Sequence, residues 1–207
     1  MREYLRSLLM TIQMLNQKGI TWAFSNEYSS MVSDAREMTL NGDNQNSLSE
    51  QRPFKGSVTY DKILWIDSDI AWTPEDVLKL YESDKDIISG AYLLASGEVM
   101  AYPKLLKQSY VYNEVLEMTE PIKVEGAGFG FICIKQGVFE ALERPWFQAS
   151  EITHPDDDGV ERTFKIMGED LSFCHRAGQR GFEIWFDPTV RVIHHKTMRL
   201  TWEGIKV

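Results

Sequence analysis

The stretch ILWIDSDI, residues 63–70, places two aspartates directly behind four apolar residues. The apolar run predicts a buried strand, and Asp67 and Asp69 fall where this strand should end. Side chains at positions i and i+2 of an extended chain point the same way, so both carboxylates are expected to face one space, with Ser68 turned away. Ligands of open α/β sheets bind at the carboxyl ends of strands. The stretch therefore predicts a binding site at the rim of an α/β sheet.

Two carboxylates held this close repel each other, and a positive group should offset the repulsion. At a separation of roughly 4 Å and an effective dielectric near 20, the repulsion amounts to about 4 kcal/mol. Mn²⁺ or Mg²⁺, which prefer hard oxygen ligands, are the simplest candidates. The alternative is a pair that only caps the following helix, but Thr73, with Pro74 after it and Asp76 three residues on, already has the features of that cap.

Composition restricts the class of protein. The chain has 207 residues, 43% of them hydrophobic and 26% charged, which suits one globular α/β domain spanning 1–207. Its net charge of −9 and its lack of a basic cluster argue against a nucleic-acid partner. Cys133 and Cys174 lack metal-ligand spacing and predict reduced thiols in a cytoplasmic protein. No apolar run is long enough to span a membrane.

Hydrophobic periodicity and turn residues predict alternating helices and strands, and hence a layered α/β fold. Predicted helices cover residues 4–16, 29–40, 73–82, 136–142 and 169–177. Predicted strands cover residues 20–24, 61–66, 86–91, 126–135, 183–186 and 190–194, with a hairpin at Gly97 and further strands within 110–124. Residues 41–57 are expected to form a mobile loop, and residues 144–165 an irregular lid or acceptor loop.

Four blocks of the sequence resemble nucleotide-sugar-dependent glycosyltransferases of the GT-A fold, in particular small soluble ones from phages and bacteria. The blocks are residues 29–37 (SSMVSDARE), 63–74 (ILWIDSDIAWTP), 124–139 (VEGAGFGFICIKQGVF) and 168–194 (GEDLSFCHRAGQRGFEIWFDPTVRVIH). The order of a DxD motif, a GED motif and a late histidine is more specific than any one of them. The resemblance implies a mixed, mostly parallel sheet flanked by helices.

The resemblance also implies a metal and nucleotide site. Asp69 would be the main ligand of Mn²⁺ or Mg²⁺, Asp67 would contact the metal or the ribose, and His194 would be a further ligand. Arg36 would point toward the nucleotide of a UDP- or GDP-sugar donor. Because neighbouring strand residues face opposite sides, only one of His194 and His195 can easily reach the metal. The alternatives are a surface histidine at a strand end and a solvated helix arginine.

Acidic and glycine residues of the later blocks are assigned to the acceptor. By the resemblance, Asp170 would take the proton from an acceptor hydroxyl of a carbohydrate or another molecule, with Glu169 orienting it, as in inverting enzymes. A retaining enzyme would use this pair only to bind substrate, and two carboxylates at a helix start are also explained by the helix dipole. Gly126 and Gly128 would let a sugar approach the backbone, and Trp146 could stack on a sugar ring.

The sequence departs from the family in one feature. Family members open with a strand that lies centrally in the sheet, and this sequence shows no such strand before its first helix. Either the sequence begins inside the fold, or the sheet lacks a middle strand and leaves an edge at which chains could associate. Two rival functions remain open. One is a nucleotide-sugar pyrophosphorylase or nucleotidyltransferase, although no glycine-rich phosphate loop is visible. The other is a carbohydrate-binding protein that keeps the fold without turnover.

Overall fold

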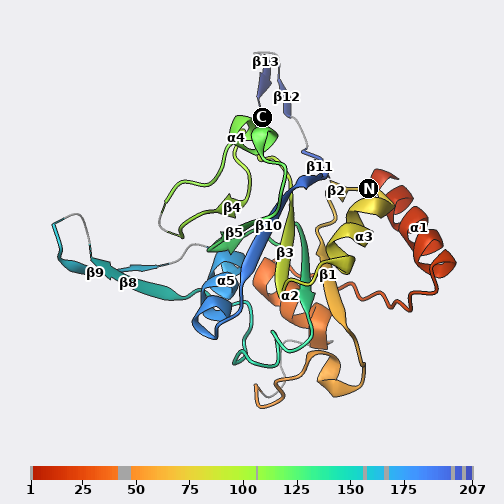
Figure 1. Ribbon diagram of the computed structural model, residues 1–207, viewed down its shortest axis with the longest axis horizontal. Helices are drawn as coiled ribbons and strands as arrows, with labels where there is room; N and C mark the ends of the chain where they lie inside the picture. The colour runs from red at the N-terminus through yellow and green to blue at the C-terminus, as the bar shows by residue number, and fades with distance from the viewer. Residues whose placement is uncertain are drawn as a thin grey trace.

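The central sheet has five strands in the order β1-β7-β3-β10-β5 (Figure 1). A computed structural model describes residues 2–41, 48–105, 107–155, 158–165, 168–196, 199–201 and 204–206. The strands are β1 (Lys62–Ile66), β3 (Ile87–Ala91), β5 (Ile122–Val124), β7 (Phe131–Lys135) and β10 (Ile184–Arg191). Only the β3–β10 pairing is parallel, and the other three are antiparallel. The sheet is mixed, as expected, but the prediction that it is mostly parallel is wrong.

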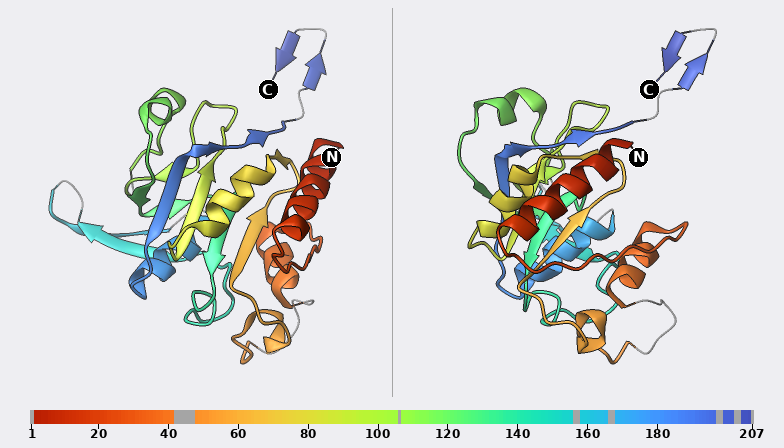
Figure 2. Two further views of the ribbon diagram at one scale, coloured as in Figure 1. Left: turned by 45° about the vertical axis from the view of Figure 1, so that its right-hand side comes forward. Right: turned by 90° about the vertical axis from the view of Figure 1, so that its right-hand side faces the viewer.

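Helices cover both faces of this sheet, as Figure 2 shows. The helices are α1 (Arg2–Gln17), α2 (Val32–Asn41), α3 (Pro74–Glu82), α4 (Tyr112–Glu117) and α5 (Glu169–Gln179). Side chains of β7 alternate between two apolar clusters: Ile132 and Ile134 pack with residues of α2 and α5, whereas Phe131 and Cys133 pack with residues of α1 and α3. This alternation is the period-2 pattern of a strand buried on both faces.

Helix α3 begins where its sequence predicts. The Thr73 side chain accepts a hydrogen bond from the backbone N–H of Asp76, whose carboxylate accepts one from the backbone N–H of Thr73. Helix α1 differs, because its most buried side chains are polar. Ser7 and Thr11 bond to the backbone and the indole N–H of Trp72. Tyr4 and Leu8 are partly buried beside them, while Leu5 and Leu9 are exposed.

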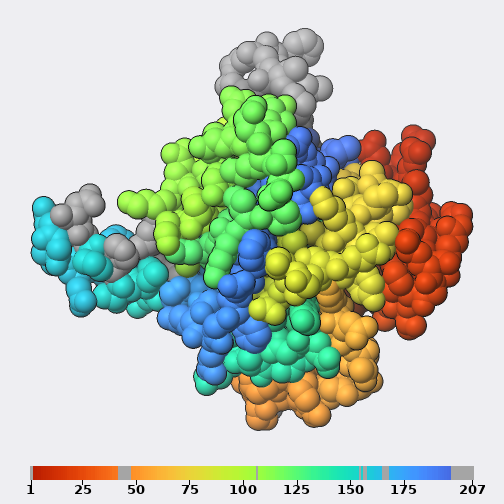
Figure 3. All heavy atoms as spheres, viewed as in Figure 1, coloured from red at the N-terminus to blue at the C-terminus, as the bar shows by residue number. Residues whose placement is uncertain are grey.

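Small two-stranded sheets complete the fold. They pair β2 (Ile70–Ala71) with β11 (Ile193–His194), β4 (Ala101–Tyr102) with β6 (Gly126–Ala127), β8 (Glu151–Pro155) with β9 (Glu161–Lys165), and β12 (Arg199–Thr201) with β13 (Gly204–Lys206). In Figure 3 the β8–β9 hairpin extends from the body beyond α5. The β12–β13 hairpin lies beyond the sheet at the top of Figure 1.

Several predicted elements are wrong. Residues 20–24 form no strand, residues 136–142 form successive turns instead of a helix, and residues 110–124 contain α4 as well as β5. Residues 144–165 include the regular β8–β9 hairpin, with 156–157 outside the described residues. Of the predicted loop 41–57, residues 42–47 lie outside the described residues, and Pro53–Gly56 forms a 3-10 turn. Strand β1, which leads into the DxD motif, lies at an edge of the described sheet.

Candidate functional site

The two aspartates of the DxD motif lie in a turn after β1 and do not continue the strand. The backbone N–H of Asp67 donates to the carbonyl of Gly130 (3.0 Å), and the N–H of Ile70 donates back to the carbonyl of Asp67 (3.0 Å). This turn directs the two carboxylates to different partners. The expectation that Asp67 and Asp69 face one space as neighbours along an extended chain is therefore wrong.

Asp69 lies beside strand β11 and the residues that follow it. Strand β2 pairs with β11, which places His194 opposite Ile70, and the backbone N–H of His195 donates to the carbonyl of Asp69 (2.8 Å). His194 Nε2 then lies 3.1 Å from Asp69 Oδ2, and its Nδ1 lies 2.7 Å from the carbonyl oxygen of Leu93. The predicted proximity of His194 and Asp69 is confirmed, although 125 residues separate them in sequence.

The same oxygen of Asp69 has a second partner. Lys196 Nζ donates to Asp69 Oδ2 at 3.0 Å, and both side chains are partly exposed. Partial burial raises the pKa of Asp69, but the bond from Lys196 and the charge of His194 outweigh it, so the pKa lies below its ordinary value. Asp69 is therefore ionised at neutral pH, with an ammonium group as its counter-ion.

Asp67 is linked to the GED motif through Arg36. The Arg36 guanidinium lies 2.7 Å from Glu169 Oε1 and 3.5 Å from Asp67 Oδ1, and it stacks over the Phe129 ring at 5.0 Å. Arg36 is buried, because α2 sets it against the start of α5. The structure thus joins Arg36, Asp67 and Glu169 in one ion-pair network, whereas the sequence assigned Arg36 to the donor nucleotide and Glu169 to the acceptor.

Asp170 lies next to this ion-pair network. Its carboxylate accepts a hydrogen bond from the backbone N–H of Leu171 (2.8 Å). Loss of solvent around it raises its pKa above the ordinary value; the charge of Arg36 opposes the rise and that of Glu169 adds to it. A carboxylate with a raised pKa is a stronger base than an exposed one, so Asp170 has the property that proton abstraction requires.

Tyr92, which the sequence did not single out, contacts both parts of the site. Its ring lies edge-on to the His194 ring, with centroids 5.4 Å apart, and its hydroxyl accepts the backbone N–H of Gly130 (3.3 Å). Gly130 in turn accepts the N–H of Asp67. Burial raises the pKa of Tyr92, and the charge of Asp170 adds to the rise. Its place at the end of β3 was the only sequence signal, because β3 ends at the same rim as β1.

Three predicted substrate contacts need correction. Trp146 is fully buried and donates its indole N–H to the carbonyl of Phe139 (2.9 Å), so it offers no face to a sugar. Gly126 and Gly128 are buried as well. A Cβ at Gly128 would lie 2.0 Å from the Tyr92 hydroxyl, and one at Gly126 would lie 2.8 Å from Leu105 and Leu171 side-chain atoms. The protein's own side chains, and not an approaching sugar, account for these glycines.

The described residues contain no complete divalent-metal site. In the described ranges, no three or more His, Cys, Asp or Glu side chains are grouped to hold a metal ion, so Asp67 does not join Asp69 and His194. Asp69 and His194 nevertheless offer an oxygen and a nitrogen 3.1 Å apart. Neighbouring ligands of an octahedral ion at 2.0–2.1 Å are about 3 Å apart, so this pair matches two adjacent positions. Mg²⁺ commonly takes its remaining ligands from water and substrate phosphates.

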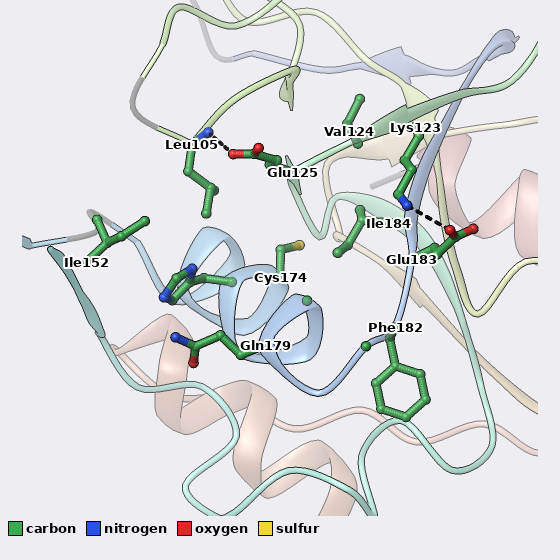
Figure 4. Close-up of a pocket in the computed structure, with 13 residues that line it drawn as sticks. Leu105, Lys123, Val124, Glu125, Ile152, Cys174, Gln179, Phe182, Glu183 and Ile184 are labelled. Atoms are coloured by element: carbon green, nitrogen blue, oxygen red, sulfur yellow. Dashed lines mark hydrogen bonds and ion pairs between the residues drawn. The ribbon is translucent and has the colours of Figure 1, made fainter. Parts of the chain in front are cut away.

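A groove lies elsewhere on the molecule. It holds about 460 Å³ between α5, β5 and β10 and is lined by residues such as Leu105, Cys174, Gln179 and Phe182 (Figure 4). None of the predicted site residues lines it. Two ion or hydrogen-bond pairs lie at its rim, Glu125 with the backbone of Leu105 and Lys123 with Glu183. The groove is therefore separate from the carboxylate site.

Comparison with known proteins gives a fold and no family. No protein-family model matches the sequence, and no curated protein matches it. Among solved structures, the chain is similar to A197 from STIV, with a TM-score of 0.50 over 93% of this chain and 91% of that chain, at 18% sequence identity. At this identity the likeness concerns the fold alone. Among the described residues, no helix is long and apolar enough to cross a membrane.

Proposed function

We propose that this chain is a glycosyltransferase with a GT-A-like fold, which moves a sugar from a UDP- or GDP-sugar to an acceptor hydroxyl with the help of Mn²⁺ or Mg²⁺. The observation that carries the proposal is the 3.1 Å approach of His194 Nε2 to Asp69 Oδ2. A histidine and an aspartate so far apart in sequence are brought together only because β11 pairs with β2 beside the DxD turn.

The bonding of His194 supports a metal between these two groups. Its Nδ1 faces the carbonyl of Leu93, which accepts but cannot donate, so Nδ1 carries a proton. Its Nε2 faces the carboxylate of Asp69, and either a hydrogen bond from Nε2–H or a cation held by both atoms accounts for that approach. An Nδ1–H bond to a backbone carbonyl is a common way in which proteins orient a metal-binding histidine. Bound there, a divalent cation would neutralise charge on the leaving nucleoside diphosphate.

Glu169 and Asp170 have different surroundings and are proposed to have different roles. Glu169 is tied to Arg36 at 2.7 Å, so we assign it to orienting the site and the acceptor. Asp170 has a raised pKa. We assign to it the removal of the proton from the acceptor hydroxyl as that oxygen attacks the sugar's anomeric carbon, which implies inversion of configuration.

Thermal unfolding and donor turnover test the proposal together. Mn²⁺ plus UDP or GDP should raise the melting temperature more than either ligand alone, because each ligand completes the site of the other. Asp69→Asn should remove this joint shift, whereas Asp170→Asn should keep it and lose transfer. Hydrolysis of a panel of UDP-, GDP- and CMP-sugars with Mn²⁺ then identifies the donor.

The result also separates the rival functions. A nucleoside triphosphate and a sugar phosphate converted to a nucleotide sugar and pyrophosphate would indicate a nucleotidyltransferase. Carbohydrate binding with no joint shift and no release of free sugar from any donor would contradict the proposal and indicate a binding protein.

A further inference from the structure

Lys196 binds the Asp69 oxygen that a metal would need. Its ammonium group lies 3.0 Å from Asp69 Oδ2, the same atom that faces His194. In the absence of a metal, this side chain supplies the positive charge beside the DxD carboxylate. Its own side chain remains 44% exposed, so it can leave without unpacking the fold.

We propose that Lys196 is a tethered cation that binds Asp69 in the empty site and moves to the donor diphosphate when a divalent metal takes Asp69. This inference rests on the proposed function, since it requires a metal and a nucleoside diphosphate at this site. It assigns to Lys196 a substrate-binding role that its sequence position after the two histidines does not indicate.

The need for such a cation follows from the charges of the site. A diphosphate has to approach the carboxylates of Asp67, Asp69 and Glu169 in a chain of net charge −9. Arg36 is poorly placed to meet it, because its side chain is only 8% exposed and is held by Glu169 and Asp67. Of the lysine and arginine side chains paired with these carboxylates in the described residues, Lys196 is the exposed one.

Metal binding would release Lys196 at the right place. An ammonium and a divalent ion cannot share one carboxylate oxygen without strong repulsion, so the metal displaces Lys196 from Asp69 Oδ2. The displaced side chain would remain anchored two residues after His194 and would be free to bind phosphate oxygens of a donor at this site. Lysine is a common partner of phosphate groups.

Two binding constants with opposite expected changes test the inference. In calorimetric titration, Lys196→Met should bind Mn²⁺ alone about two- to five-fold more tightly than the wild type, the range that an exposed ion pair is worth. In saturating Mn²⁺, the same variant should bind UDP or GDP about ten-fold more weakly, as the loss of a charged hydrogen bond predicts. Lys196→Arg should restore most of the nucleotide affinity.

Lys123→Met is the matched control, because Lys123 is an exposed lysine 2.7 Å from Glu183, outside the carboxylate site. It removes the same charge and should change neither constant. Unchanged nucleotide affinity in Lys196→Met, with Mn²⁺-dependent binding intact, overturns the inference and leaves the proposed function in place. Unchanged Mn²⁺ affinity overturns the competition. Absence of Mn²⁺ binding in both wild type and Lys196→Met overturns the inference and the proposed metal site together.

Discussion

Replacing Arg36 with methionine should destabilise the protein more than any exposed charge replacement. Arg36 Nη1 lies 2.7 Å from Glu169 Oε1 and Nη2 lies 3.5 Å from Asp67 Oδ1, while the guanidinium covers the Phe129 ring. Methionine keeps the apolar stem beside Phe129 and removes the charge. Glu169 then stays partly buried without its cation, which is the costly step.

The magnitude follows from burial. Removing one partner of a fully buried pair costs about 3–5 kcal/mol. The Glu169 side chain retains 22% exposure and can regain some water, so we expect about 2–3 kcal/mol for Arg36→Met. For a chain of this length, that loss corresponds to a drop in melting temperature of roughly 4–12 °C.

Urea unfolding followed by circular dichroism measures this loss, and Lys123→Met is a control of equal geometry. Lys123 and Glu183 also lie 2.7 Å apart, but both side chains are about half exposed, so this variant should lose less than about 1 kcal/mol. The double variant Arg36→Met/Glu169→Gln should recover part of the stability, because Glu169 is then no longer a partly buried charge without its cation. Equally small losses of stability in Arg36→Met and Lys123→Met would refute the view that burial makes the Arg36 ion pairs stabilising.

Two further predictions concern Asp170 and Trp146. Solvent loss raises the pKa of Asp170 in the folded protein. The charged carboxylate therefore lowers the free energy of unfolding above the folded pKa, and this cost disappears below the unfolded pKa. Asp170→Asn should increase the free energy of unfolding at pH 7 but not below about pH 4. Urea unfolding across this pH range checks the sign, and an equal gain at both ends would contradict it. Trp146→Ala should lose about 3–5 kcal/mol in the same assay because the ring is fully buried, whereas exposed Trp22→Ala should lose less than about 1 kcal/mol. Comparable losses would contradict the burial of Trp146.

Elements that depend on interactions between residues close in sequence were predicted correctly. The cap at Thr73 and the start of α3 follow from hydrogen bonds within four residues, so sequence alone suffices. The apolar runs of β1 and β7 were equally clear. Residues 20–24 have strand-forming residue types but no strand to pair with in the described sheet, and strand propensity depends on such pairing.

The predicted sugar contacts of Trp146 and Gly128 were wrong because tertiary packing buries both residues. Trp146 was expected on a loop that binds sugar, but its ring is buried and packs edge-on against Phe139, with centroids 5.5 Å apart. Gly128 looked like a substrate contact, although the space beside it belongs to Tyr92, which precedes it by 36 residues. The neighbour of Gly128 cannot be read from local periodicity, because it depends on how distant strands are paired.

The charges of the carboxylates and cations at the site bear on whether it needs a metal. One positive group was expected to serve both DxD aspartates, but each has its own cation in the structure, Arg36 beside Asp67 and Lys196 beside Asp69. Four carboxylates, those of Asp67, Asp69, Glu169 and Asp170, face these two permanent cations, which leaves two excess negative charges when Asp170 is ionised. One divalent cation would balance them, and a diphosphate arriving with it would restore the need for Lys196. A metal at this site is thus supported less by the aspartate pair than by the 3.1 Å approach of His194 Nε2 to Asp69 Oδ2, which a direct hydrogen bond between the two groups also explains.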